Sequence, residues 1–374
     1  MSFKHVARAA SPLNRRQFLA GLCGAAAALS ASPFSSSQEA VHAVPLIHQT
    51  DLFRPHMDPD DHFDLACVYG LAHMGKVKLL GVLCDYPPPR HPADPDISAV
   101  AMLNRLTGLA APLVTGSAQK PASRRDKLEA ASPRDLHGVN WLLQTLRESP
   151  EPAVITIVGS CRDVAVAGRR DPELFTKKCR AIYLNAGTGA PDRRPGDGVE
   201  YNVELDPGSY AGVFDIPCPV YWMPCFERLA AGKFVGERHG TYYTFMMGEL
   251  FAKLSPPMQR YFLSMLEKET GTRWLESLNR PVDPARLEHW GRQTRNMWCT
   301  AGFLHLAGLE LGNDVYRFVP VKVDCDDTGQ TRWTEGESQP ARYKFEVTDR
   351  PRYAAAMTQA LVTLVGKGNI NDER

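Results

Sequence analysis

Acidic side chains crowd into one short stretch of the sequence, "TDLFRPHMDPDDHFDLA", which runs from residue 50 to residue 66. It holds five aspartates: Asp51, Asp58, Asp60, Asp61 and Asp64. Like charges repel, so this crowding indicates either a solvated turn with a helix start or a place for a divalent cation. Acids are favoured at the positive N-terminus of a helix, so Asp60 and Asp61 could simply cap the helix that follows. We expect Asp64, one turn further on, to lie on the solvated surface of that helix.

More oxygen-bearing groups follow other apolar runs. "AVITIV" ends at Val158, and "RAIYLN" ends in Asn185. A loop then leads to "EYNVELDP", which contains Glu200 and Asn202. In open α/β sheets, ligands bind beyond the carboxyl ends of the strands, so these positions are candidates for one site. Carboxylate, amide and carbonyl oxygens suit a hard cation such as Ca²⁺.

The elements that must position these groups alternate along the chain from residue 44. Short apolar runs such as "AVPLIHQTD", "VKLLGVLCD", "APLVTG", "AVITIVG" and "RAIYLNAG" are typical of buried strands. Between them lie helical stretches such as "HFDLACVYGLAHMG" and "VNWLLQTLRES". This β-α-β rhythm predicts an α/β fold with a mostly parallel sheet flanked by helices. We find no clear linker, so residues 44–374 are expected to form one domain.

The second half of the chain has a different pattern. Residues 230–290 are rich in aromatic residues and methionine, and they predict a helical cap region that either packs as core or partly covers the site. The stretch "YRFVPVKVDCDDTGQTRWTEG" predicts a β-hairpin with its turn at Asp-Asp-Thr-Gly. The stretch "RPRYAAAMTQALVTLVGK" predicts a closing helix.

The N-terminus resembles an export signal. In "SPLNRRQFLAGLCGAAAALSASPF" the paired Arg15 and Arg16 precede a short apolar run, as in a twin-arginine signal. The small residues of "VHA" predict cleavage after Ala43, so residues 1–43 are expected to be a signal peptide. The alternative is an amphipathic start of a folded domain. The run is short and alanine-rich for a membrane span, so we expect a periplasmic or secreted protein.

Charge and cysteine content narrow the class of protein further. The formal net charge of +1 argues against a nucleic-acid-binding protein. The nine cysteines include no CxxC pair and lie in apolar runs. A disulfide framework is therefore not expected, and most of the thiols should be buried as small apolar groups.

The order of these segments resembles the inosine–uridine preferring nucleoside hydrolase family, as a divergent, exported member. That family opens with a strand ending in Asp-x-Asp-Pro-x-x-Asp-Asp, and "QTDLFRPHMDPDDHFDLA" is similar, with a longer loop. "LLGVLCD", "LHGVNWLL", "ITIVGSCRDVAVAGRRDPEL" and "RAIYLNAGTG" resemble its next segments in order. "EYNVELDPGSYAGVF" is similar to its Glu-Phe-Asn and Asp-Pro motif.

The resemblance implies a Ca²⁺ site and a hydrolytic mechanism. Asp51 would be a Ca²⁺ ligand that also activates the attacking water, and Asp60 would contact the ribose as a further catalytic residue. Asp61 and the backbone carbonyl of Val158 would be further metal ligands. Cleavage of an N-glycosidic bond passes through an oxocarbenium-like state, and a Ca²⁺-oriented water with a carboxylate base suits it.

The resemblance also implies residues that bind the substrate. Glu200 and Asn202 would bind the hydroxyls of a nucleoside or related ribosyl compound, because a buried hydroxyl without a partner is costly. Asn185 is a further candidate at a strand end. His137 either lies near the base or is a structural histidine in a loop. Relatives with this fold are often dimers or tetramers, so a homodimer or homotetramer is expected.

One segment departs from the family pattern. The family's last metal ligand is an aspartate in a His-Asp pair at the start of a C-terminal helix, whereas "RQTRNMWCTAGFLHLAG" contains no acid. Asn296 is the nearest oxygen ligand, and Asp58 either substitutes for the missing acid or belongs to a turn. A neutral ligand should weaken Ca²⁺ binding. Two hypotheses therefore remain: an active N-ribohydrolase, and a catalytically impaired member that binds a nucleoside or sugar.

Overall fold

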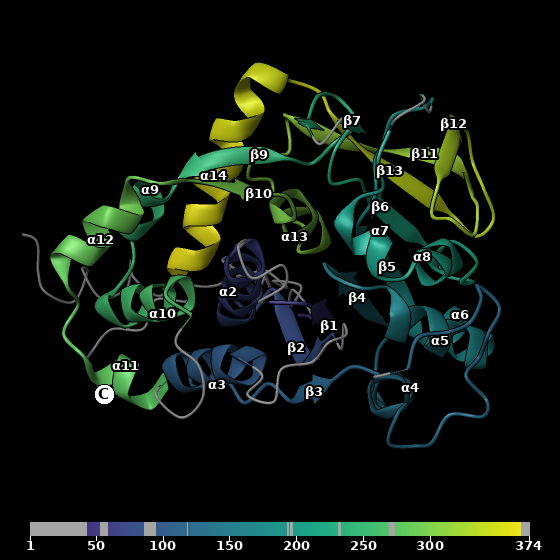
Figure 1. Ribbon diagram of the computed structural model, residues 1–374, viewed down its shortest axis with the longest axis horizontal. Helices are drawn as coiled ribbons and strands as arrows, with labels where there is room; N and C mark the ends of the chain where they lie inside the picture. Colours follow the sequence, from purple (N-terminus) through teal and green to yellow (C-terminus); the bar gives the residue numbers. More distant parts are fainter. Residues whose placement is uncertain are drawn as a thin grey trace, which may run out of the picture. The chain divides into compact units, whose positions relative to one another are not determined.

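In the computed structural model, the described residues form a nine-stranded sheet in the order β12-β11-β13-β6-β5-β4-β1-β2-β3 (Figure 1). The structure describes residues 43–52, 59–85, 95–117, 119–192, 194, 197–230, 233–268 and 274–367, which belong to one unit, His42–Arg374. Neighbouring strands run parallel from β3 across to β13, and β11 and β12 are antiparallel. This arrangement confirms the predicted α/β fold with a mostly parallel sheet. The strands are β1 (Val44–Thr50), β2 (Val77–Cys84), β3 (Leu113–Thr115), β4 (Ala153–Ile157), β5 (Cys179–Asn185), β6 (Val220–Met223), β11 (Tyr316–Cys325), β12 (Thr331–Glu335) and β13 (Arg342–Val347).

The order in which the chain adds strands to the sheet changes side at β1. From β1 the chain adds β2 and β3 on one side, and then β4, β5 and β6 on the other. Helices leave successive strands toward opposite faces at such a point, so a crevice opens at the carboxyl ends of β1 and β4. Asp51 directly follows β1, and Val158 directly follows β4.

The strands are apolar because both faces of the sheet are covered. Successive side chains point to opposite faces, so Leu46 joins one hydrophobic cluster and Ile47 the other. Val154 and Ile155 of β4 divide in the same way. Every residue of β4 is buried, which is typical of a parallel strand between two helical layers.

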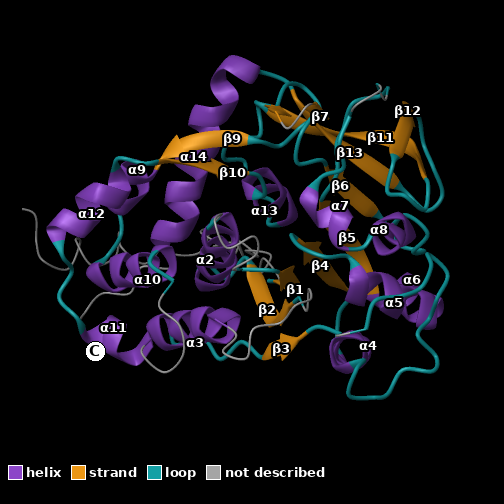
Figure 2. Ribbon diagram, in the orientation of Figure 1, coloured by secondary structure: helices purple, strands orange, loops and turns teal. Residues whose placement is uncertain are grey.

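Two sets of helices form those layers (Figures 1 and 2). The first cluster contains residues from α2 (Asp60–His73), α3 (Pro95–Thr107), α10 (Pro256–Leu266), α13 (Thr300–Leu306) and α14 (Arg350–Lys367). The second contains residues from α4 (His137–Glu148), α5 (Arg162–Arg170), α6 (Pro172–Lys178), α7 (Tyr201–Leu205) and α8 (Pro207–Val213). The predicted closing helix is α14, and β11 with β12 forms the predicted hairpin.

The region predicted as a helical cap begins with strands. β9 (Tyr243–Met246) pairs with β10 (Thr294–Met297), and β8 (Lys233–Val235) pairs with β7 (Arg228–Ala230). The helices α9 (Met247–Phe251), α10, α11 (Trp274–Asn279) and α12 (Pro284–Gly291) follow. Phe262 of α10 stacks on Phe63 of α2 with ring centroids 4.8 Å apart. The aromatic pattern therefore reflects packing in the core, which was the first of the two alternatives.

Two further predictions concern the thiols and the membrane. The eight cysteines from Cys67 to Cys325 are all buried and free, as expected. Among the residues that the structure describes, no helix has the length and apolar character needed to cross a membrane. The predicted signal peptide lies outside the described residues, except for Ala43.

Candidate active site

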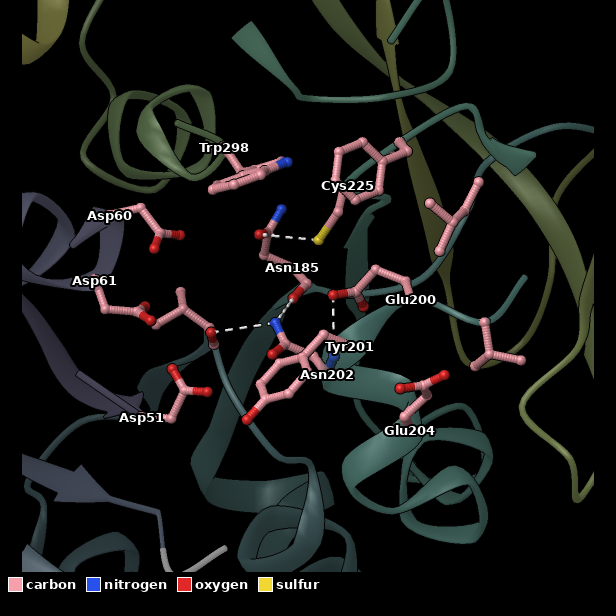
Figure 3. A pocket seen from close by; sticks show the side chains of 14 residues that line it. Asp51, Asp60, Asp61, Asn185, Glu200, Tyr201, Asn202, Glu204, Cys225 and Trp298 are labelled. Carbon is pink, nitrogen blue, oxygen red and sulfur yellow. Dashed lines mark hydrogen bonds between the residues drawn. The ribbon is translucent and has the colours of Figure 1, made fainter. Parts of the chain in front are cut away.

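A cavity of about 270 Å³ lies at the carboxyl edge of the sheet (Figure 3). Seven residues predicted from the sequence line it: Asp51, Asp60, Asp61, Val158, Asn185, Glu200 and Asn202. Seven others also line it: Val199, Tyr201, Glu204, Cys225, Phe226, Leu229 and Trp298. Figure 3 shows the three aspartates on one side of the cavity and Glu200 with Glu204 on the other. The sheet therefore brings together most of the site that the strand ends predicted.

Asp51 and Asp61 form a buried acidic pair. Asp51 directly follows β1, Asp61 lies in the first turn of α2, and each side chain is at most 4% exposed. Burial raises the pKa of Asp61 well above its usual range, and the nearby charge of Asp51 and a hydrogen bond to it raise the pKa further. Oδ1 of Asp61 has no hydrogen-bond partner. Such a pair is stable only with a shared proton or a bound cation.

Helix capping does not account for the two acids that open α2. The residue before the helix is Pro59, and no side chain caps the helix there. Asp60 and Asp61 lie inside the first turn, where the helix dipole favours negative charge. Asp60 is half-buried and lines the cavity.

Asp85 is a buried acid that we did not predict, and it supports the Val158 turn. It directly follows β2, and its Oδ1 accepts a hydrogen bond from Nε2 of Gln49 at 2.6 Å. Its Oδ2 accepts a hydrogen bond from the backbone N–H of Ser160. A Cβ on Gly159 would lie 2.6 Å from Oδ2 of Asp85 and 3.0 Å from Cβ of Asp51. The turn after Val158 therefore packs directly against two acids and has no room for a side chain.

Glu200 and Asn202 form the opposite side of the cavity. Glu200 is the N-cap of α7, where its Oε1 accepts from the N–H of Asn202 at 2.9 Å and its Oε2 from that of Gly187 at 2.8 Å. Burial raises the pKa of Glu200 to about 7, although these hydrogen bonds oppose the shift. Asn202 donates to the carbonyl oxygens of Val158 and Asn185, both at 3.2 Å. The two residues thus hold the ends of β4 and β5 as well as facing the cavity.

The side chain of Asn185 is held by protein groups. Its Nδ2 donates to the carbonyl of Met223 at 2.9 Å. Its Oδ1 accepts from the thiols of Cys225 at 3.4 Å and Cys299 at 3.3 Å. Asn185 therefore joins the ends of β5 and β6 to the start of α13.

The remaining wall of the cavity is apolar and aromatic. Phe226 and Trp298 lie edge to face, with ring centroids 5.8 Å apart. Trp298 is buried, and its indole Nε1 has no hydrogen-bond partner. Cys225, Phe226 and Leu229 follow β6, a four-residue strand that we did not predict. Had β6 been recognised between its flanking prolines, the same rule about strand ends would have pointed to these residues.

Two of the predicted site residues that the structure describes, Asn296 and His137, do not line the cavity. Asn296 lies on β10, and its Oδ1 accepts a hydrogen bond from Tyr242 at 3.1 Å. His137 is exposed at the first position of α4. The structure therefore does not bring either one to the cavity. Asp58 lies outside the described residues.

The expectation for Asp64 was wrong. It is fully buried, because α2 packs between the sheet and other helices and every residue from Asp61 to Leu71 is buried. Its carboxyl lies near the thiol of Cys299 at the start of α13, and its charge contributes to the raised pKa of Asp61. The cluster of acids around Asp61 therefore includes Asp64, which does not line the cavity.

The donors at the cavity match a hard cation in type. Asp51 and Asp61 offer carboxylate oxygens, and Val158 offers a carbonyl oxygen. The orphaned Oδ1 of Asp61 is consistent with such a ligand. However, the described residues contain no group of three or more acidic, histidine or cysteine side chains arranged to hold a metal ion. A cation here would therefore rely on two carboxylates and neutral oxygens.

Comparisons with known proteins give partial matches. No protein-family model matches the chain. It is 33% identical over 89 residues to the pyrimidine-specific ribonucleoside hydrolase RihA of Citrobacter koseri, covering 24% of this chain and 28% of the relative. It is 32% identical over 91 residues to RihA of Escherichia coli, covering 24% and 29%. The match thus spans less than a third of the length of these curated relatives.

Solved structures that are similar to this chain include nucleoside hydrolases. An inosine-uridine preferring nucleoside hydrolase from Bacillus anthracis has a TM-score of 0.46 and 14% identity, with 86% of this chain and 99% of that chain covered. A plant nucleoside hydrolase has a TM-score of 0.48 and 13% identity, with 85% and 99% covered.

Proposed function

We propose that this protein is a hydrolase that cleaves the N-glycosidic bond of a ribonucleoside or a related ribosyl compound. The observation that carries the proposal is the cavity itself, which places carboxylates and amides on one part of its surface and aromatic rings on another. A ribosyl compound has the same two halves, a polyhydroxylated sugar and a flat base. The short matches to ribonucleoside hydrolases support the same reaction.

The acidic part of the cavity suits the sugar. Asp60, Glu200 and Asn202 are placed to accept or donate hydrogen bonds to ribose hydroxyls, which would otherwise be buried without partners. An oxocarbenium-like transition state carries positive charge, and the surrounding carboxylates stabilise that charge more strongly in a buried site than in water. The apolar wall of Phe226, Leu229 and Trp298 suits the leaving base.

Asp51 is the proposed general base. It lies at the cavity beside Asp61, so it can accept a proton from a water that attacks the sugar carbon. Ca²⁺ bound by Asp51, Asp61 and the Val158 carbonyl would orient that water and lower its pKa. Both acids would be ionised in that state, because their charges would be balanced without a shared proton.

A second candidate function is binding without cleavage. The residue that favours it is Cys299, which is buried at the start of α13. An acid at this position would add negative charge near the cavity, and the neutral thiol does not. A site with only two carboxylate ligands holds Ca²⁺ weakly, so a nucleoside or sugar could be bound and not cleaved.

The N-terminal arginine pair supports the further proposal that the protein is exported by the twin-arginine pathway.

A nucleoside panel separates the two functions. The mature protein is incubated with purine and pyrimidine nucleosides and CaCl₂, and the free base is followed by chromatography. Release of base that is lost on adding a chelator supports the hydrolase with its Ca²⁺ site. Calorimetric binding of a nucleoside without any release of base supports the binding protein. If no nucleoside is bound or cleaved, both candidates are rejected.

A further inference from the structure

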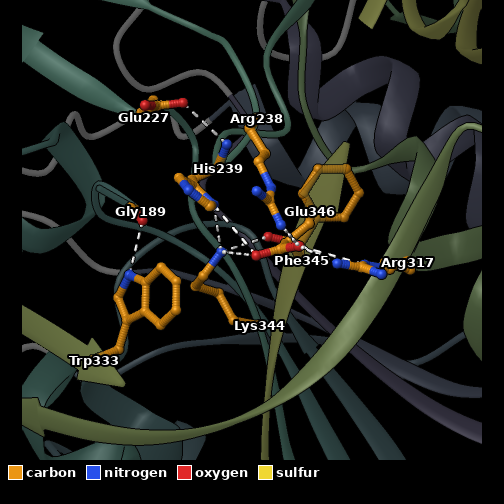
Figure 4. Close-up of polar contacts among 9 residues, drawn as sticks. All are labelled: Gly189, Glu227, Arg238, His239, Arg317, Trp333, Lys344, Phe345 and Glu346. Atoms are coloured by element: carbon orange, nitrogen blue, oxygen red, sulfur yellow. Dashed lines mark hydrogen bonds and ion pairs between the residues drawn. The ribbon is translucent and has the colours of Figure 1, made fainter. Parts of the chain in front are cut away.

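A second group of charged side chains surrounds Lys344 of β13 (Figure 4). Lys344 is fully buried, and its Nζ lies 2.8 Å from Nδ1 of His239 and 3.5 Å from Oε1 of Glu346. Nζ also donates to the carbonyl of Phe345 at 3.1 Å and lies 4.2 Å from the ring centre of Trp333. A buried ammonium persists only when its donors are satisfied, so these partners fix its position.

The contact with Lys344 fixes the state of His239. An ammonium has no lone pair, so Nδ1 of His239 must accept, and the imidazole is neutral with its proton on Nε2. Burial and the charge of Lys344 lower the pKa of His239, in agreement with this tautomer. The backbone N–H of His239 donates to Oε2 of Glu227 at 3.1 Å. A chain of contacts thus runs from β13 to the segment that follows β6.

That segment, residues 224–230, supplies part of the cavity wall. Cys225, Phe226 and Leu229 line the cavity. The carbonyl of Phe226 accepts from the N–H of Gly189 at 2.9 Å, and the carbonyl of Gly189 accepts from Nε1 of Trp333 at 2.9 Å. The backbone of Phe226 is therefore held by the same tryptophan that covers the Lys344 ammonium.

Close packing leaves the segment little freedom on its other side. A Cβ on Gly240, next to His239, would lie 2.6 Å from the backbone of Phe226 and of Glu227. Any shift of His239 must therefore move the backbone that carries Phe226. Lys344 itself is not among the lining residues, so its influence on the cavity passes through this contact.

We propose that Lys344 is a positioning residue for the apolar wall: through His239, Glu227 and Trp333 it fixes residues 224–230 and so determines which leaving base the cavity accepts. The inference rests on the proposed function, because it assigns this wall to the base. Lys344 should affect the base half of the substrate and leave the sugar half, which the acids hold, unchanged.

Lys344→Met tests the proposal, since methionine fills similar volume without a charge. Arg317→Met is the matched control, because Arg317 also contacts Glu346, at 3.1 Å, but is 54% exposed and lies on the solvent side. We expect Lys344→Met to lower kcat/KM for the preferred base by about tenfold or more through misplacement of the wall. The inhibition constant of free ribose should stay within about twofold of wild type, and Arg317→Met should leave both values unchanged.

Hydrogen exchange provides a readout that does not depend on catalysis. Amides of residues 187–190 and 225–230 should lose protection in Lys344→Met and keep it in Arg317→Met, with α10 unchanged in both. If Lys344→Met folds poorly, His239→Phe removes the acceptor and His239→Asn restores one near the position of Nδ1. Loss of protection in the first and recovery in the second support the same positioning contact.

A spectroscopic titration tests whether the ammonium acts through Trp333. Glu346, Arg238, His239 and Glu227 face Lys344, and burial lowers its pKa to about 8 against the charge of Glu346. The wild-type emission should therefore change with a midpoint near pH 8, and the change should be absent in Lys344→Met and in Trp333→Phe.

The outcomes separate this inference from the proposed function. Unchanged exchange in Lys344→Met, or an equal loss of ribose and base recognition, overturns the positioning role. A wild-type protein that neither binds nor cleaves any nucleoside overturns the proposed function, and the exchange and fluorescence results still decide whether Lys344 fixes the segment.

Discussion

Two clusters of buried charged side chains lie toward the carboxyl ends of the strands, and they are neutralised in different ways. In the Lys344 cluster, the carboxylate of Glu346 forms ion pairs with Arg238, Arg317 and Lys344. Lys344 also contacts the imidazole of His239 and the ring face of Trp333. At the cavity, the charged side chains that act on Asp61 are Asp51, Asp60 and Asp64, all of the same sign. No lysine, arginine or histidine is among the described residues that line it.

This difference distinguishes a structural cluster from a binding site. The Lys344 cluster contains its own counter-charges, so it is complete when the chain folds. The acidic cluster is complete only when a proton or an external cation enters, which is the condition for a site that binds something. Removing an acid should therefore have opposite effects on stability in the two places.

The largest expected effect follows from removing Asp61. Asp61→Ala takes away a carboxylate that the proposed mechanism uses for both the cation and the transition state, so kcat/KM should fall by at least about 10³-fold. We expect CaCl₂ to raise the Tm of the wild type by binding to the folded state, and this rise should be absent in Asp61→Ala. Glu173→Gln, an exposed acid on α6, is the control. Retained turnover in Asp61→Ala would remove Asp61 from the mechanism.

Removal of Glu346 should destabilise the protein. Glu346→Gln keeps the size of the side chain but leaves the buried Lys344 without its opposite charge, so the free energy of unfolding should fall by about 3 kcal/mol. Urea denaturation measures it. Glu335→Gln on the neighbouring β12, where the acid is exposed, should change it by less than about 0.5 kcal/mol. Equal effects of the two variants would show that the Lys344 cluster contributes nothing beyond surface charge.

The buried carboxyl group of Glu200 should make the free energy of unfolding fall as pH rises. The pKa of Glu200 is raised to about 7 by burial, from a usual 4.5. Between these values the folded chain binds more protons than the unfolded chain, so stability is lost as pH increases through this window. The contribution is roughly 3 kcal/mol. In chelator, denaturant midpoints from pH 4 to 8 should fall less steeply for Glu200→Gln than for wild type. A parallel pH profile for the two proteins would contradict this assignment.

The smallest expected effect is at Asp64. Asp64→Asn removes one of the like charges near Asp61, so in chelator the free energy of unfolding should rise by about 1 kcal/mol. The same change should weaken Ca²⁺ binding, because the cavity then attracts a cation less strongly. Calorimetric titration and urea denaturation measure the two effects. A fall in stability would instead show that the local contacts of the Asp64 carboxyl outweigh the repulsion.

Most of the polar side of the site could be predicted from the sequence, for a simple physical reason. Parallel strands are short and apolar, so their ends are easy to see, and their carboxyl ends must meet at one edge. Asp51, Val158 and Asn185 were found in this way. Glu200 and Asn202 were predicted from the loop that follows Asn185 and from the resemblance of "EYNVELDP" to a Glu-Phe-Asn motif.

The apolar wall could not be predicted because its elements have weak local signals. β6 has only four residues between prolines, and Trp298 lies where a short strand meets a short helix. Asp64 was misplaced because a carboxylate normally marks a solvated helix face, and only the tertiary packing of α2 shows that this helix has none at that point. Asn296 was chosen for its chemistry alone, and the direction of β10 takes its side chain to Tyr242.

The tight packing of Gly159 predicts a result for mutagenesis. Because Gly159 packs against Asp85 and Asp51, even alanine should not be tolerated at this position. A second change that shortens Asp85 creates the space that alanine lacks. In a random library, inactive Gly159→Ala chains should therefore regain folding through suppressors at codon 85, and that pairing would report the contact without a new structure.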